Sequence, residues 1–150
     1  MTSLPNRFYH WIRDPSALSL AREGRTVSGC EHLRGHKYCL LVTYRRSGEA
    51  VPTPVWFGLG AGKLYVRTEA EAAKVKRIGN DPRARVAPCT ARGKPLGPPA
   101  DCLVRVLDDP GEERVAEAAL QGNYGLGRRL YEGAGGVLGP AAVYLEITPE

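Results

Sequence analysis

The stretch Tyr38-Cys-Leu-Leu-Val-Thr-Tyr44, followed by Ala50-Val-Pro-Thr-Pro-Val-Trp-Phe57, decides the fold of this 150-residue chain. The first run is rich in β-branched and aromatic residues and is typical of a buried strand. The residues between the two runs hold a turn with Gly48 at its tip, and a second strand is expected over residues 50–59. The sequence therefore predicts an antiparallel hairpin here.

Strand and helix signals follow one another along the rest of the chain. Further strands are expected over residues 64–68, 83–91, 100–107 and 141–148, and helices over residues 16–22, 69–78, 112–121 and 124–132. Thr68 and Glu71 have the spacing of a capping box, which predicts that the second helix begins directly after the third strand. Six short strands with only short helices between them favour a barrel over a doubly wound sheet.

The composition, with 43% hydrophobic and 25% charged residues, fits a single globular domain. Residues 1–31 show no clear period, and we expect them to form an N-terminal extension to a domain of residues 32–150. No apolar run approaches the roughly 18 residues that span a membrane, and the charged start does not fit an export signal, so a cytoplasmic location is expected. The formal net charge of +5 favours an anionic partner.

The second strand contains two prolines at alternate positions, Pro52 and Pro54. Proline cannot donate to a strand ladder, so this strand is expected to lie at a sheet edge with part of its backbone unpaired. The amides of Thr53 and Val55 could then face a planar heterocycle that carries donors and acceptors along its rim. An edge strand that proline merely protects against aggregation is the alternative.

A basic cluster surrounds the junction between the third strand and the second helix, at Arg67, Thr68, Lys74, Lys76 and Arg77. A helix N-terminus presents free amides and a partial positive charge, which together attract phosphate. Lys74 and Arg77 are three residues apart and share one helix face, whereas Lys76 points elsewhere. The cluster predicts a phosphate site, with a solvated helix face as the alternative.

The four cysteines form no Cys-x-x-Cys pair, and the three histidines complete no zinc spacing, so no metal site is expected. We interpret the thiols as buried small side chains. Within Val86-Ala-Pro-Cys89, Pro88 suggests a second exposed backbone segment close to the basic helix. Packing is the favoured role for Cys89, because no acid or histidine near it in sequence would activate its thiol.

Taken together, the motifs of residues 32–148 resemble the pyridoxamine-phosphate-oxidase-like class of deazaflavin-dependent (coenzyme F420-dependent) oxidoreductases, the flavin/deazaflavin oxidoreductase B group. Their order and spacing match that class over most of the chain. The segments that carry the likeness are Lys37–Gly48, Val51–Phe57, Gly62–Val66, Lys74–Ile78, Asp81–Arg83, Val86–Cys89, Arg92-Gly93 and Gly97-Pro-Pro99.

This resemblance implies a mainly β (α+β) protein: a six-stranded antiparallel split β-barrel of the FMN-binding type, forming a homodimer with the cofactor at the subunit interface. It implies coenzyme F420 as the cofactor and a small organic molecule as the hydride partner. The ring would lie along one strand, the phosphate and acidic tail would meet the basic cluster, and a third strand would lie close by. The implied cofactor-binding residues are Pro52, Thr53, Pro54, Val55, Trp56, Arg67, Thr68, Lys74, Lys76, Arg77, Ala87, Pro88 and Cys89.

Three other functions stay open at this point. The same fold could hold FMN, or it could carry the deazaflavin without turnover. Binding of single-stranded nucleic acid is disfavoured, because aromatic residues are not interleaved with the basic run over residues 67–94. The protein residue that would complete a reduction as proton donor is not evident, and Tyr124 or Tyr131 is a hypothesis.

Overall fold

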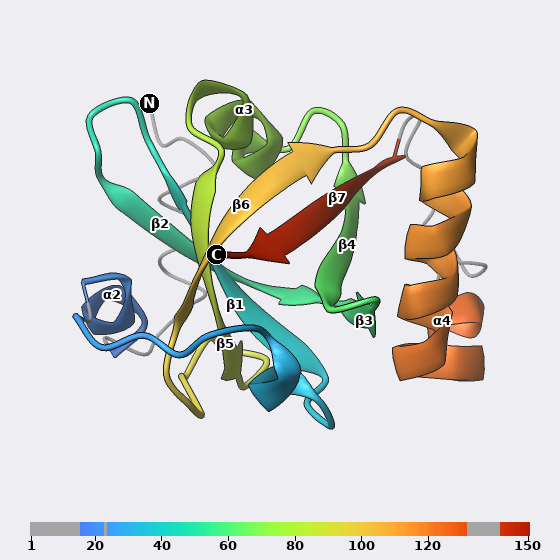
Figure 1. Cartoon of the computed structure of the whole chain (residues 1–150), viewed down its shortest axis with the longest axis horizontal. Helices are drawn as coiled ribbons and strands as arrows, with labels where there is room; N and C mark the ends of the chain where they lie inside the picture. Colours follow the sequence, from blue (N-terminus) through green and yellow to red (C-terminus); the bar gives the residue numbers. More distant parts are fainter. Residues whose placement is uncertain (1–15, 23, 132–141) are drawn as a thin grey trace.

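The computed structural model describes residues 16–22, 24–131 and 142–150, and within them the chain forms one antiparallel sheet of seven strands. Figure 1 shows this sheet curled into a half-barrel. Its strand order is β2-β1-β5-β6-β7-β4-β3, so β2 and β3 form the two edges. The strands are β1 (Tyr38–Tyr44), β2 (Ala50–Trp56), β3 (Gly58–Gly60), β4 (Lys63–Glu69), β5 (Arg83–Cys89), β6 (Ala100–Val106) and β7 (Ala142–Pro149).

The seventh strand arises because the single strand that was expected here is interrupted between residues 56 and 58, which divides it into β2 and β3. β2 pairs with β1 at one edge of the sheet, whereas β3 pairs with β4 at the other. Phe57, between them, is only 1% exposed and is anchored in the core. Gly58 is required at the start of β3, because a Cβ there would lie 2.3 Å from the backbone of Ala119. The expected six-stranded barrel is therefore corrected to seven strands.

The main core fills the inner face of the curled sheet. Its fully buried members include Leu41, Val86, Leu145 and Ile147. Each occupies a strand position whose side chain points to the inner face, because side chains alternate between the two faces of a sheet. The opposite face of β1 and β5 is covered by the short helix α2 (Ser16–Ala21), through a second cluster. The expected first helix is thus confirmed and packs on the outside of the sheet.

The helix after β4 is α3 (Ala73–Asn80), and it begins four residues later than expected. Thr68 and Glu69 instead continue β4, where they pair with residues 143 and 142 of β7. Ala72 is the N-cap residue and makes no side-chain cap hydrogen bond, so the expected capping box is wrong. Pairing along a whole strand outweighs the two local hydrogen bonds that a capping box offers.

The last helix is continuous, where two helices were expected. α4 (Pro110–Tyr131) runs through Gly122, which a helix tolerates at a cost of about 1 kcal/mol. Asp109 caps its start, because Oδ2 accepts a hydrogen bond from the Glu112 amide at 3.0 Å. In Figure 1, α4 and α2 flank the sheet on opposite sides and α3 lies between them at one end. The Tyr124 and Tyr131 side chains lie outside the described part of the structure, so the proton-donor hypothesis stays untested.

Candidate functional site

Two cations of α3 are each held by a threonine hydroxyl from the sheet. Arg77 donates from Nε to Oγ1 of Thr43 on β1 at 2.7 Å. Lys74 donates from Nζ to Oγ1 of Thr68 on β4 at 3.5 Å. Both cations are partly buried, and Ile78 beside them is anchored in the main core. The structure therefore brings together three of the predicted site residues, and we name Thr43, Thr68, Lys74 and Arg77 the α3 cluster.

The α3 cluster concentrates positive charge in a partly buried place. Lys74 forms no ion pair within the described residues, and burial, together with the neighbouring Arg77 charge, lowers the pKa of its amine. Glu69 acts on that pKa in the opposite direction, but more weakly. A partly buried cation with only this weak carboxylate influence is unfavourable unless an anion binds beside it.

Two other predicted residues of the basic cluster lie elsewhere. The Arg67 guanidinium lies over the Tyr144 ring at 5.9 Å from its centroid. Tyr144 packs with Tyr65 in the cluster that faces α4, on the outer side of the sheet. Because neighbouring residues of a strand point to opposite faces, Arg67 is directed away from Thr68 and from the inner face. Lys76 is exposed. The structure thus does not place Arg67 and Lys76 with the other cations.

The expected edge position of the proline-containing strand is confirmed, since β2 pairs only with β1 among the described strands. Pro52 lies opposite Val42 and Pro54 opposite Leu40. Alternate residues of an antiparallel strand direct both backbone groups at the partner, so prolines occupy the positions that face away from β1. In that arrangement the amides at residues 53 and 55 point at β1, and the expectation that they face a ligand stays a prediction. The open edge offers proline carbonyls instead.

β5 carries the other proline segment, and it is buried. Ala87 and Cys89 are 0% and 3% exposed, and the Pro88 carbonyl accepts a hydrogen bond from the Leu96 amide at 2.7 Å. The expected exposed backbone segment is therefore wrong at Pro88. Burial raises the pKa of the Cys89 thiol to about 12, which fits the packing role expected for it.

β1 lies between the two proline-containing segments and pairs with both of them. Leu40 pairs with Pro54 on one side and with Ala87 on the other. Tyr38 likewise pairs with Trp56 and Cys89. Thr43, which holds Arg77, lies five residues farther along the same strand, or about 17 Å at the usual strand rise. The candidate site therefore has two ends. One is the open backbone edge of β2, and the other is the positively charged α3 cluster.

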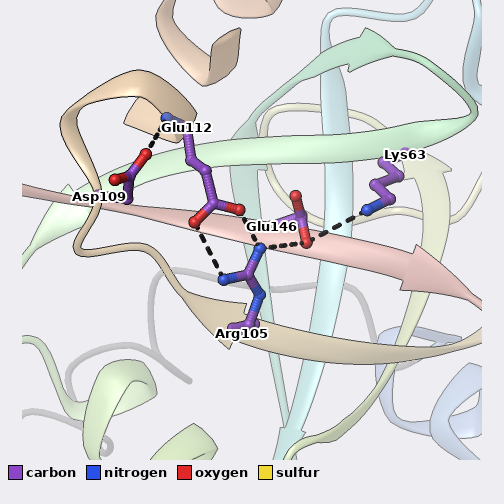
Figure 2. A network of polar contacts seen from close by, with 5 residues as sticks. All are labelled: Lys63, Arg105, Asp109, Glu112 and Glu146. Atoms are coloured by element: carbon purple, nitrogen blue, oxygen red, sulfur yellow. Dashed lines mark hydrogen bonds and ion pairs between the residues drawn. The ribbon is translucent and has the colours of Figure 1, made fainter. Parts of the chain in front are cut away.

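A second polar cluster lies on the outer face of the sheet beside α4, and Figure 2 shows its members. Glu146 on β7 is 8% exposed and accepts a hydrogen bond from Arg105 at 3.0 Å. Lys63 lies 3.4 Å from the same carboxylate, and Arg105 also pairs with Glu112 of α4. We name Lys63, Arg105, Glu112 and Glu146 the α4 clamp. Each cation in it has a carboxylate partner.

Two cavities lie away from the predicted site. One, of about 480 Å³, is lined by residues that include Tyr44, Arg83 and Asp101. The other, of about 250 Å³, lies between β3 and α4 and includes Leu59 and Asn123. Neither is lined by any of the predicted cofactor-binding residues. Among the described residues, no group of three His, Cys, Asp or Glu side chains could hold a metal ion. No helix in that part of the chain is long and apolar enough to cross a membrane.

Sequence reasoning missed one member of the α3 cluster, Thr43. Its position on the inner face follows from the alternation of β1, but its partner Arg77 lies 34 residues away. No local pattern joins the two residues. The α4 clamp was missed for the same reason, since the partners Arg105 and Glu146 are 41 residues apart.

Known structures share this fold at low sequence identity. The putative pyridoxamine 5′-phosphate oxidase of Listeria innocua is 18% identical, with a TM-score of 0.52, over 79% of this chain and 87% of that one. An FAD-binding protein of Mesorhizobium loti is 13% identical, with a TM-score of 0.57, over 80% and 84%. A protein named F420 reductase is 19% identical, with a TM-score of 0.54, over 83% and 96%. The sequence matches no protein-family model and no curated protein.

These similarities show the fold, which is that of the pyridoxamine-phosphate-oxidase-like proteins. Neighbours with the same fold are also named for haem storage and haem binding, so the fold does not select a cofactor.

Proposed function

We propose that this chain binds a phosphate-bearing flavin or deazaflavin, with coenzyme F420 preferred, and transfers a hydride between it and a small organic substrate. The observation that carries the proposal is the α3 cluster, in which the Lys74 amine is partly buried beside the charge of Arg77 and donates a hydrogen bond to the Thr68 hydroxyl. A phosphate group would compensate the charge of Lys74, which forms no ion pair within the described residues and feels the Glu69 carboxylate only weakly. The F420 reductase name of one neighbour agrees with this choice.

The two ends of the site suit the two ends of such a cofactor. The tricyclic ring would lie along the β2 edge, over residues 52–56, with residues 87–89 behind the intervening β1 strand. The phosphate would meet Lys74, Arg77 and Thr68, with the acidic tail extending toward exposed Lys76. The Arg67 side chain faces α4, away from the α3 cluster of its own chain. We therefore propose that Arg67 contributes to the cofactor site of the partner subunit.

The protein contributes binding and orientation, and the bound cofactor supplies the hydride chemistry. The α3 cations anchor the anionic end, which fixes where the ring lies along β2 and limits its freedom before reaction. We further propose a homodimer that completes the site at its interface, with residues 1–31 as an extension to a binding domain of residues 32–150. A shared site is consistent with the position of β2 at an open sheet edge.

Side-by-side titration tests the proposal. Coenzyme F420, FMN and their phosphate-free counterparts, the deazaflavin riboside and riboflavin, are each titrated with the purified protein by fluorescence. We expect tight binding of coenzyme F420 and a clear loss when the phosphate-bearing tail is removed. Tighter binding of FMN would instead favour a flavin-dependent oxidoreductase. Tight F420 binding without hydride transfer to any acceptor would favour a carrier, and equal binding with and without phosphate would contradict the proposal.

A double variant, Lys74→Ala with Arg77→Ala, tests the phosphate position. It should weaken F420 binding strongly and make the remaining binding less dependent on salt, because ionic contacts are screened by salt. The matched control is Arg92→Ala with Lys94→Ala, which removes the same charge from two exposed positions on the turn after β5. Unchanged F420 affinity in the first variant would contradict the proposed position of the phosphate at α3.

A further inference from the structure

The cavity between β3 and α4 has two walls that are fixed against each other. Its volume is about 250 Å³, and its lining includes Phe57 and Leu59 on one side and Ala118, Ala119 and Gly122 of α4 on the other. A Cβ at Gly58 would lie 2.3 Å from the backbone of Ala119, so β3 and α4 already touch backbone to backbone there. The helix therefore cannot move closer to β3 and close the cavity.

Gly122 keeps space open at this cavity, although the packing of the chain does not require a glycine there. Among the residues that the structure describes, nothing lies within 4 Å of the place that a Cβ at residue 122 would take. Its backbone continues the helical conformation of α4. A glycine inside a helix costs stability relative to alanine. Neither close packing nor a left-handed backbone accounts for that cost, whereas an open cavity does.

Asn123 gives the cavity one oriented polar group. It lines the cavity, and its Nδ2 donates to the Phe57 carbonyl at 2.8 Å and to the His36 carbonyl at 3.4 Å. The amide cannot be turned round, because its oxygen would then face two other oxygens. Within the described part of the chain, no group donates to Oδ1 of Asn123. This oxygen is therefore left as an acceptor for a ligand.

The charge beside the cavity is already paired. Arg34 also belongs to the lining, and its Nε and Nη2 donate to the Glu31 carboxylate at 2.9 and 3.2 Å. Apolar walls with a single free acceptor favour a neutral ligand over an ion. An apolar cavity of about 150 Å³ is enough to hold benzene. The larger space here therefore admits one ring with a small substituent.

We propose that this cavity is a binding site for a neutral one-ring organic molecule that carries an O–H or N–H donor. The ring lies between β3 and α4, and its donor binds Oδ1 of Asn123. This site goes beyond the proposed function and does not depend on it, because none of the proposed cofactor-binding residues lines the cavity.

Titration with phenol, and with toluene as the ligand that lacks the donor, tests the inference. Each is added to isotope-labelled protein, and NMR shifts give the dissociation constant together with the residues that respond. We expect saturable binding of phenol, with a dissociation constant on the order of 1 mM for a ligand of so few atoms. The shifts should centre on the lining of the cavity. Toluene is the more apolar ligand, so tighter binding of phenol requires a polar contact.

Gly122→Leu places a large side chain at the cavity. It should weaken phenol binding by about tenfold or more, because the new side chain takes the space of the ring. It should not lower stability, since leucine forms helices better than glycine, and this separates lost binding from a fold defect. Gly79→Leu is the matched control on α3, where a Cβ likewise meets nothing within 4 Å among the described residues. If Gly122→Leu does not fold, Ala118→Leu fills the same space from one helical turn earlier.

Asn123→Leu removes the amide and keeps the approximate size of the side chain. The preference for phenol over toluene should fall about fivefold, which is the effect of losing one neutral hydrogen bond. If this variant does not fold, the wild-type comparison carries the test, because tighter binding of toluene than of phenol would overturn the role of the donor.

The outcomes can be distinguished from those for the proposed function. The titrations contain no flavin or deazaflavin, so their result does not depend on whether the chain binds coenzyme F420. Absence of saturable phenol binding by the wild type would overturn the inference. Phenol binding that Gly122→Leu and Ala118→Leu leave unchanged would also overturn it, as would shifts centred away from β3 and α4.

Discussion

The α3 cluster and the α4 clamp are two groups of cations, and they are held in opposite ways. In the α4 clamp, Glu146 lies between Arg105 and Lys63, and Glu112 adds a second carboxylate from the helix (Figure 2). In the α3 cluster, Lys74 and Arg77 each donate a hydrogen bond to a threonine hydroxyl, and Lys74 has no ion pair within the described residues.

This difference separates a cluster that fastens the fold from one that, under the proposed function, receives an anion. The charges of the clamp pair with one another and connect α4 to β6 and β7, so these ion pairs stabilise the folded chain. The Lys74 amine in the α3 cluster is a partly buried cation whose pKa is lowered, so its charge costs stability in the free protein. Binding sites commonly carry such a cost, because a site that satisfies itself has nothing left for a ligand.

The largest effect is expected from breaking the clamp at its buried centre. Glu146→Ala should lower the free energy of unfolding by about 2 kcal/mol, because it leaves two cations without their shared carboxylate. Partial exposure of Arg105 and Lys63 keeps the loss below that of a fully buried pair. Urea denaturation measures it. Glu49→Ala, which removes the exposed partner of Arg45, should change stability by no more than about 0.5 kcal/mol. Equal losses in the two variants would contradict the central role of Glu146.

A smaller effect of opposite sign is expected in the α3 cluster. The pKa of the Lys74 amine is lower in the folded chain than its ordinary value of 10.5. Its charged form therefore costs stability below the folded pKa, and this cost fades as pH rises toward the unfolded value. Lys74→Met should keep neutral-pH stability or raise it by up to about 1 kcal/mol, while lowering the preference for phosphate-bearing ligands. Denaturation at pH 7 and at pH 10 checks both signs, since the difference from wild type should shrink at the higher pH. A clear loss of stability at pH 7 would make Lys74 a structural residue.

Much of this architecture could be predicted because it is written in local patterns. Leu145 and Ile147 alternate with polar residues in the last strand, and both are buried in the main core of the structure. Pro52 and Pro54 predict an edge strand because a missing amide hydrogen is a property of the residue itself. Such signals survive folding because no distant contact is needed to create them.

Other features depend on distant contacts, and sequence reasoning failed at them. The break at Phe57 exists because residues on either side pair with different edges of the sheet. The capping box at Thr68 was displaced by pairing with β7, about 75 residues away in sequence. Thr43 could be placed on the correct face but not beside Arg77. The basic cluster was predicted as one group, and only the folded sheet reveals that Arg67 points to its other face.

The smallest effect sharpens the comparison through pH. The Arg105 hydrogen bond holds the pKa of the Glu112 carboxyl below its ordinary value, which is the expected sign for a clamp that uses charged carboxylates. A lowered folded pKa contributes stability above the unfolded pKa of about 4.3, and that contribution is lost as pH falls through the folded value. Glu112→Gln should therefore lose stability less steeply than wild type between about pH 5 and pH 3. Glu113→Gln is the matched control on the same helical turn. Some acid loss should persist, because Arg34 and Arg83 lower the pKa of Glu31 and Asp81 in the same way. Parallel pH profiles for wild type and Glu112→Gln would show that the α4 clamp does not depend on the charge of this carboxylate.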